Sequence, residues 1–139
     1  MESLGGRTVT DAEYRTLAQF RRALRTFLRF SEEAARAAGI TPGQYQLMVM
    51  IRGAGPGAAP TVGDIADALK LRHHSAVELV DRAVVAGLVR RHPDPQDGRR
   101  QRLTLTDAGE KKLAALAAVH VEELRRLGED GLASLGTLS

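Results

Sequence analysis

Basic side chains outnumber acidic ones in one part of this chain, between residues 70 and 102. This window holds eight basic and four acidic residues, so it carries a formal charge of +4, while the rest of the 139-residue chain carries −1. A local excess of cations favours a polyphosphate partner such as double-stranded DNA. The alternative is an ordinary solvated basic surface, and charge alone leaves both interpretations open.

Two groups of residues in this window have side chains suited to DNA contacts. The first group is Arg72, His73, His74, Ser75, Glu78 and Arg82, and the second is Asp97, Arg99, Arg100 and Arg102. Arginine can bind guanine or a phosphate, serine can donate or accept, and glutamate can accept from cytosine. Each of these residues could instead be a solvated surface side chain.

Catalysis and metal binding have weaker support. His74 and Glu78 are four residues apart and would share a helix face, a spacing that metal ligands use. However, the chain has no HExxH motif, no glycine-rich phosphate loop, no nucleophile elbow and no third ligand nearby. It also has no cysteine, which excludes disulfides and thiolate sites. We therefore expect no enzymatic activity, no cofactor and no metal.

Residues 61–106 contain the pattern that would position these side chains. Thr61-x-x-Asp64 has the spacing of a capping box and begins a short helix, after which residues 70–72 must turn without a glycine. A longer helix then runs from His73 or His74 to Ala86. Strands over 88–92 and 99–105 flank the turn sequence PDPQDG. The pattern predicts a helix-turn-helix with a β-hairpin wing.

The wing has a specific expected chemistry. An arginine at the tip of a narrow hairpin can enter the minor groove, where negative potential is concentrated. Asp97 would brace Arg99, while Arg100 and Arg102 would meet phosphates. We expect the wing arginines to supply most of the affinity, and Ser75 and Glu78 to tune sequence choice.

Long amphipathic helices flank this central region. Thr10-x-x-Glu13 opens a helix from Asp11 to about Ala38, and a second helix begins at Thr41. After Thr106 a final helix runs to Gly128, and a short terminal helix is expected within 129–138.

The apolar segments are short. The longest apolar run has seven residues, far below the about 20 that span a bilayer. The first residues, MESLGGRT, contain no apolar core of a secretory signal. We therefore expect a cytoplasmic protein without a membrane partner.

Residues 88–113, LVRRHPDPQDGRRQRLTLTDAGEKKL, resemble the wing and following helix of the MarR family of bacterial transcription regulators. In that family Asp-x-Arg lies in the wing and Leu-Thr-x-x-Gly opens the next helix. Here these motifs are Asp97-Gly98-Arg99 and Leu105-Thr106-Asp107-Ala108-Gly109. The preceding SAVELVDRAVVAGLV is similar to the family's recognition helix, and the layout of the whole chain fits the family.

The resemblance implies a mainly α fold with a small β-hairpin. Its expected parts are a flexible tail (1–10), an N-terminal dimerisation helix (11–40), a winged helix-turn-helix (41–106) and C-terminal dimerisation helices (107–139). It also implies a homodimeric repressor that binds a pseudo-palindromic operator in double-stranded DNA and is released by a small, often aromatic, effector. Tyr45, Met48 and Arg52 could line the effector cleft, although a core position is favoured for the first two. A helical interaction module without sequence-specific DNA binding stays open as the alternative.

Overall fold

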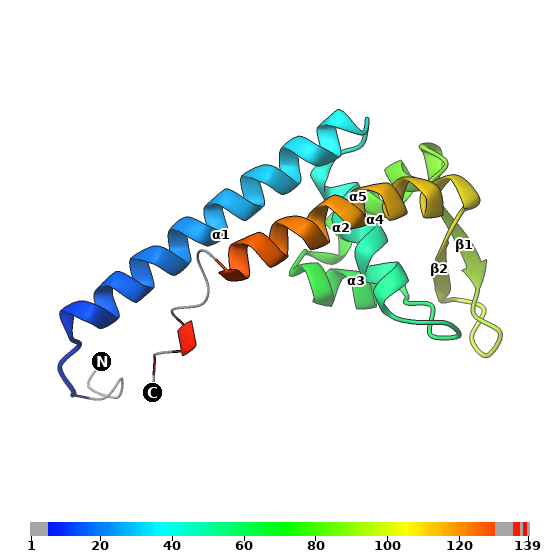
Figure 1. The fold of residues 1–139 in the computed structure, drawn as a ribbon. Coiled ribbons are helices and arrows are strands. Elements are labelled where there is room, and N and C mark those ends of the chain that lie inside the picture. The colour runs from blue at the N-terminus through cyan, green and yellow to red at the C-terminus, as the bar shows by residue number, and fades with distance from the viewer. Residues whose placement is uncertain (1–5, 130–134, 137, 139) are drawn as a thin grey trace. The chain divides into compact units, whose positions relative to one another are not determined.

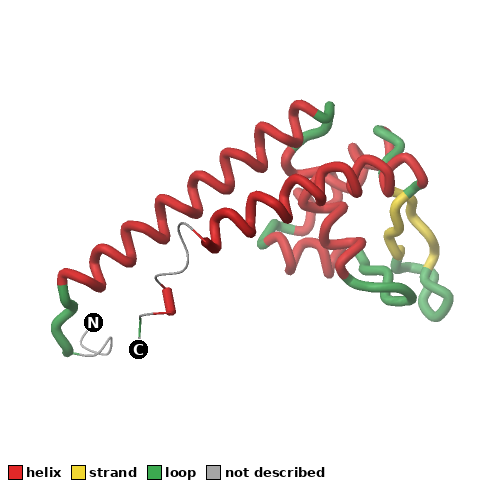
Figure 2. The backbone as a smooth tube through the Cα atoms, in the orientation of Figure 1, coloured by secondary structure: helices red, strands yellow, loops and turns green. Residues whose placement is uncertain are grey.

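The computed structural model describes residues 6–129, 135, 136 and 138. Its elements follow the order α1 (Asp11–Ala37), α2 (Pro42–Gly53), α3 (Val62–Leu69), α4 (His73–Val85), β1 (Val89–Pro93), β2 (Gln101–Leu105) and α5 (Asp107–Leu127) (Figure 1). The two strands form an antiparallel hairpin in an otherwise helical structure (Figure 2). The predicted mainly α fold with a winged helix-turn-helix is therefore confirmed.

The chain divides into two compact units, residues 32–118 and residues 1–31 with 119–139. The 32–118 unit has one aliphatic core, to which α2, α3, α4 and β2 contribute fully buried side chains. These side chains are Leu47, Met48, Ile65, Val80 and Leu103. Their burial drives the three helices and the hairpin together, because each element presents an apolar face to the same core.

Threonine caps begin four helices, α1, α2, α3 and α5, as the sequence predicts. The Thr41 and Thr61 hydroxyls each accept a hydrogen bond from the backbone N–H three residues later, at 3.1 Å. The side chains of Gln44 and Asp64 in turn accept from the backbone N–H groups of Thr41 and Thr61, at 3.0 and 2.9 Å, which completes both capping boxes. The turn between α3 and α4 has no glycine, and Lys70 adopts the left-handed conformation there, at φ 57°.

The hairpin strands are shifted and shortened relative to the prediction of 88–92 and 99–105. β1 begins at Val89, and β2 begins at Gln101 instead of Arg99. The Asp97 carboxylate accepts from the Arg99 N–H at 3.1 Å, and the Asp97 carbonyl accepts from the Arg100 N–H at 3.0 Å. These local bonds extend the turn through residue 100, so Arg99 and Arg100 lie in the tip and not in the strand.

In the unit made of residues 1–31 and 119–139, α1 and α5 pack against each other through a buried histidine. His120 Nε2 lies 2.8 Å from Ser31 Oγ, and the rings of Phe27 and Phe30 meet the imidazole edge-on. Glu123 on the next turn of α5 is also buried and is paired with Arg126.

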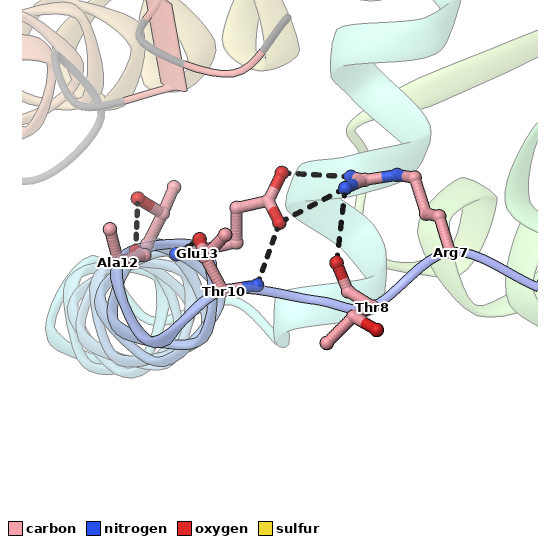
Figure 3. Close-up of polar contacts among 6 residues, drawn as sticks. Arg7, Thr8, Thr10, Ala12 and Glu13 are labelled. Atoms are coloured by element: carbon pink, nitrogen blue, oxygen red, sulfur yellow. Dashed lines mark hydrogen bonds and ion pairs between the residues drawn. The ribbon is translucent and has the colours of Figure 1, made fainter.

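The first turn of α1 carries the third predicted capping box. Glu13 Oε1 accepts from the Thr10 N–H at 3.0 Å, and Thr10 Oγ1 accepts from the Glu13 N–H at 3.1 Å. Figure 3 shows that Arg7 completes the arrangement, because its guanidinium binds both oxygens of Glu13 at 2.8 and 3.3 Å. Residue 7, placed in the expected tail of 1–10, is thus linked to the helix.

The helix ends lie close to their expected positions. α1 ends at Ala37 with Gly39 at φ 82°, and α5 ends at Leu127. The short helix expected within 129–138 falls mostly outside the described residues. Within the described part of the chain, no helix is both long and apolar enough to cross a membrane.

Candidate nucleic-acid interface

The helix α4 turns one face to the core and another to solvent. Ala76, Val80 and Ala83 are fully buried, whereas the residues predicted to contact DNA lie on the accessible side. Arg72, His73, His74, Glu78 and Arg82 are exposed, and Ser75 is half-buried. The helix therefore presents a polar surface of about three turns while its opposite side is held by packing.

A cleft of about 440 Å³ lies between the start of α3, the start of α4 and the wing. Its lining is Thr61, Val62, Gly63, His73, Val77, Arg91, Arg99, Arg100 and Gln101. Three arginines thus converge on the N-terminus of α3, whose N–H groups add a positive partial charge. This arrangement suits a phosphate or another polyanionic group.

A smaller hollow of about 260 Å³ brings together three other residues predicted to contact DNA from α4. Ser75, Glu78 and Arg82 line it together with Leu79, and Thr41 and Gln44 at the start of α2 complete it. Six of the ten predicted residues thus line these two depressions, whereas Arg72, His74, Asp97 and Arg102 line neither.

Asp97 braces Arg99 as the sequence predicts. The carboxylate accepts from both the backbone N–H and the side-chain Nε of Arg99, at 3.1 and 3.4 Å. The Arg99 side chain is nevertheless 94% exposed, and Arg100 is exposed beside it. Both guanidinium groups are therefore accessible to a partner at the tip of the wing.

Arg102 differs from these two arginines. We expected it to meet a phosphate, but its guanidinium binds the Asp94 carboxylate and the Ala59 carbonyl. The interaction with residue 59 spans 43 positions, so neither charge pattern nor strand alternation could reveal it. The Arg102 guanidinium is thus already engaged by protein acceptors.

Sequence reasoning missed a second contact of the wing. Arg91 on β1 forms an ion pair with Asp81 on α4, and it also lines the larger cleft. The pair links α4 to the wing across ten positions. Arg91 lies in a run of two arginines, and only the register of β1 shows that Arg90 is exposed while Arg91 turns toward α4.

Two carboxylates near the cleft are held in their ionised form. The backbone N–H of Thr61 lowers the pKa of Asp64, and the nearby cations Arg102 and Arg100 act in the same direction. The backbone N–H of Gln96 lowers the pKa of Asp94, again with help from Arg102. Neither acid is therefore a proton donor near neutral pH.

The three residues expected to line an effector cleft do not share one hollow within the 32–118 unit. Tyr45 and Met48 belong to the aliphatic core, and burial raises the pKa of the Tyr45 phenol. Arg52 is exposed, lies 3.4 Å from Glu110, and lines a hollow of about 380 Å³ beside β2. Among the residues that the structure places, no three His, Asp or Glu side chains cluster as metal ligands would.

A helical scaffold that exposes one polar helix and an arginine-tipped hairpin defines a winged helix-turn-helix protein. A sequence model of the MarR family matches residues 38–100. The structure of AbsC, a MarR family transcriptional regulator from Streptomyces coelicolor, superposes with a TM-score of 0.72 at 25% identity, covering 89% of this chain and 83% of that chain. No match was found among curated protein sequences.

Two further solved structures share the fold and contain DNA. One is a mutant of MarR from E. coli complexed with operator DNA (TM-score 0.69, 24% identity, 85% of this chain and 86% of that chain). The other is a mutant of MepR from S. aureus bound to an oligodeoxyribonucleotide (TM-score 0.66, 24% identity, 88% and 85%). Residues 38–100 thus match the model of the MarR family, and the fold over most of the chain is similar to that of solved MarR family transcription regulators.

Proposed function

We propose that this protein is a repressor that binds a pseudo-palindromic operator as a homodimer. The observation that carries the proposal is the cleft in which Arg91, Arg99 and Arg100 meet the N-termini of α3 and α4. A duplex offers a phosphate backbone to such a cleft and base edges to the adjoining helix. The similar structures that hold operator DNA or an oligodeoxyribonucleotide support the same use of the fold.

The recognition helix α4 would enter the major groove, which is about 12 Å wide and admits one α-helix. Its N-terminal residues His73, His74 and Ser75 would then face base edges, with Glu78 and Arg82 one and two turns further along. Arg99 would reach from the wing into the minor groove, and Arg100 would meet the adjoining phosphates.

The exposed apolar residues of the other unit support a homodimer. Tyr14, Leu17, Leu24 and Leu28 are exposed on α1, and Val119, Val121 and Leu124 are exposed on α5. Contiguous apolar side chains of this kind mark protein interfaces, because water contact with them is unfavourable. A second copy of the chain would cover them and place two recognition helices on half-sites about one helical turn apart.

Repression would follow from occupancy of an operator in the cytoplasm, and a small aromatic effector would release the DNA. Of the three residues expected around the effector, Arg52 is the exposed cation, and an anionic ligand would bind it by competing with Glu110. Tyr45 and Met48 would act through the core beneath it.

The proposal is tested by fluorescence anisotropy with a duplex of the DNA immediately upstream of the gene, compared with a scrambled duplex. We expect preferential binding with a steep salt dependence, because released counterions dominate the free energy of association. Arg99→Ala should weaken binding on the order of tenfold.

Arg125→Ala is the matched control, because Arg125 is an exposed cation on α5 and lies in the other unit. A well-folded wild-type protein indifferent to both duplexes at low salt would instead support the helical interaction module. If Arg99→Ala left the salt dependence of binding unchanged, Arg99 at the tip of the wing would not contact DNA.

A further inference from the structure

The base of the wing is attached to the loop that precedes α3. Arg102 Nη1 donates to the Ala59 carbonyl at 2.8 Å, and the next residue, Leu103, donates its backbone N–H to the Pro60 carbonyl at 2.8 Å. Thr61 forms an isolated antiparallel bridge with Arg102. The loop before α3 thus runs beside β2 and extends the hairpin by one short edge (Figure 1).

Asp94 continues this attachment toward the tip of the wing. Its Oδ2 accepts from Arg102 Nε at 3.2 Å and lies 3.1 Å from Nη2, while its Oδ1 accepts from the Gln96 N–H at 2.9 Å. The Asp94 backbone N–H donates to the Arg100 carbonyl at 2.9 Å. Asp94 therefore links Arg102 to the first part of the turn through its buried carboxylate, and it contacts Arg100 through its backbone.

All three guanidinium nitrogens of Arg102 contact protein acceptors, and its acidic partner is buried. The Asp94 side chain is 7% exposed and that of Arg102 is 35% exposed, compared with 94% for Arg99. A phosphate ligand needs donors that face the solvent before DNA arrives, since breaking such a buried pair would leave an unpaired carboxylate.

We propose that Arg102 and Asp94 are positioning residues, which fix the tip of the wing so that Arg99 and Arg100 face the DNA. The inference rests on the proposed DNA-binding function and specifies how the wing performs it. Arg102 supplies a fixed geometry, and Arg99 and Arg100 supply the contacts.

The charge of Asp94 distinguishes this role from direct phosphate binding. If Arg102 bound a phosphate, Asp94→Asn would tighten DNA binding, because it removes a negative charge and frees the arginine. If Asp94 positions the tip, the same change weakens binding even though it makes the protein more positive. Arg102→Lys adds a second distinction, because lysine keeps the charge but cannot reproduce the three-nitrogen contact.

The experiment measures the affinity of the full chain for a mixed-sequence duplex by fluorescence anisotropy over a range of salt concentrations. We expect Asp94→Asn, Arg102→Lys and Arg102→Gln to weaken binding by similar factors, on the order of tenfold. In an Arg99→Ala/Arg100→Ala background, Arg102→Gln should cause no further loss, since the groups that it positions are gone. The matched control is Arg125→Gln, which removes an exposed arginine–carboxylate pair on α5 and should leave binding unchanged.

Three results would overturn the inference: tighter binding by Asp94→Asn, wild-type affinity in Arg102→Lys, or a loss by Arg102→Gln that persists in the double-alanine background. A loss that persists in the double-alanine background would also follow if Arg102 only maintained the folded state. Comparing Arg102→Gln in the two backgrounds therefore separates positioning from simple stabilisation. A wild-type protein that fails to bind the duplex at low salt would overturn the proposed function together with this inference. If the wild type binds DNA in a salt-dependent way but the losses from Arg102→Gln and from the double-alanine change add up, this inference alone is overturned.

Discussion

Neighbouring arginines of the wing differ in what their guanidinium groups contact. Arg99 and Arg100 are exposed at the tip, whereas Arg91 is paired with Asp81 and Arg102 with Asp94. Their chemistry is identical, so the difference comes only from strand register and from distant partners. The number of arginines in a basic window therefore overstates the number available to a ligand.

Glu13 illustrates how a single residue couples charge to local structure. The Arg7 guanidinium, with the Thr10 N–H next in importance, lowers the pKa of this carboxyl from 4.5 to about 2. Because the folded-state pKa lies below the ordinary value, the stabilisation is fully present above pH 4.5 and is lost as the pH falls through about 2.

We expect an NMR titration to give Glu13 a midpoint near 2 and to show that Arg7→Ala moves it upward toward 4.5. Arg125→Ala should leave the midpoint unchanged, because it lies outside the contacts of Glu13. A Glu13 midpoint near its ordinary value in the wild type would contradict the capping arrangement drawn in Figure 3.

At the scale of elements, the junction between α4 and α5 is held by backbone and threonine hydrogen bonds. Leu88 follows α4, and its carbonyl accepts from the Thr106 N–H at 3.0 Å. The Thr106 hydroxyl donates to the Gly87 carbonyl at 2.6 Å and accepts from the Gly109 N–H at 2.9 Å. A Cβ at Gly109 would lie 2.2 Å from the Leu88 carbonyl oxygen, which explains why this position of the Leu-Thr-x-x-Gly motif must be glycine.

Gly109→Ala should therefore lower the free energy of unfolding by at least about 2 kcal/mol, because the obstacle is backbone and overpacking alone costs about 1–3 kcal/mol. Urea denaturation followed by circular dichroism measures the change. Gly53→Ala is the matched control: a Cβ there meets nothing within 4 Å, so helix propensity should leave it neutral or stabilised by up to about 1 kcal/mol. If the two variants had equal free energies of unfolding, the backbone at the junction would be able to shift without destabilising the fold.

The elements that the sequence predicts well are those whose determinants are local. The caps at Thr10, Thr41 and Thr61 depend on residues three positions apart, so the spacing in the sequence is enough to predict them. The predicted start of β2 at Arg99 is wrong by two residues, because the Asp97 carboxylate and carbonyl accept hydrogen bonds from Arg99 and Arg100 and prolong the turn. The roles of Arg102 and Gly109 depend on partners at positions 59 and 88, and only the tertiary fold brings these together.

At the scale of the whole molecule, self-association is the property that the exposed apolar side chains of α1 and α5 predict. Sedimentation velocity should show a dimer for the wild type. Leu24→Lys/Leu28→Lys should shift the protein toward monomer, since each lysine would have to lose its hydration within an apolar interface.

Val85→Lys serves as the control, because Val85 is the most exposed of the large apolar residues in the described part of the chain, at 89%, and lies on α4 outside those two helices. Circular dichroism of each variant separates dissociation from unfolding. A wild type that sediments as a monomer, or a lysine double variant that remains dimeric, would place the interface elsewhere.

The unequal exposure of the wing arginines also determines where a protease can cut. Trypsin requires an accessible arginine on a backbone that can enter its cleft, and loop tips satisfy both conditions. Arg99 and Arg100 fulfil them in the DNA-free chain, whereas Arg102 lies in a paired strand with its side chain engaged. Limited digestion should therefore nick the chain first at the tip, and bound duplex should shield the same peptide bonds, so fragment masses alone would report occupancy of the wing.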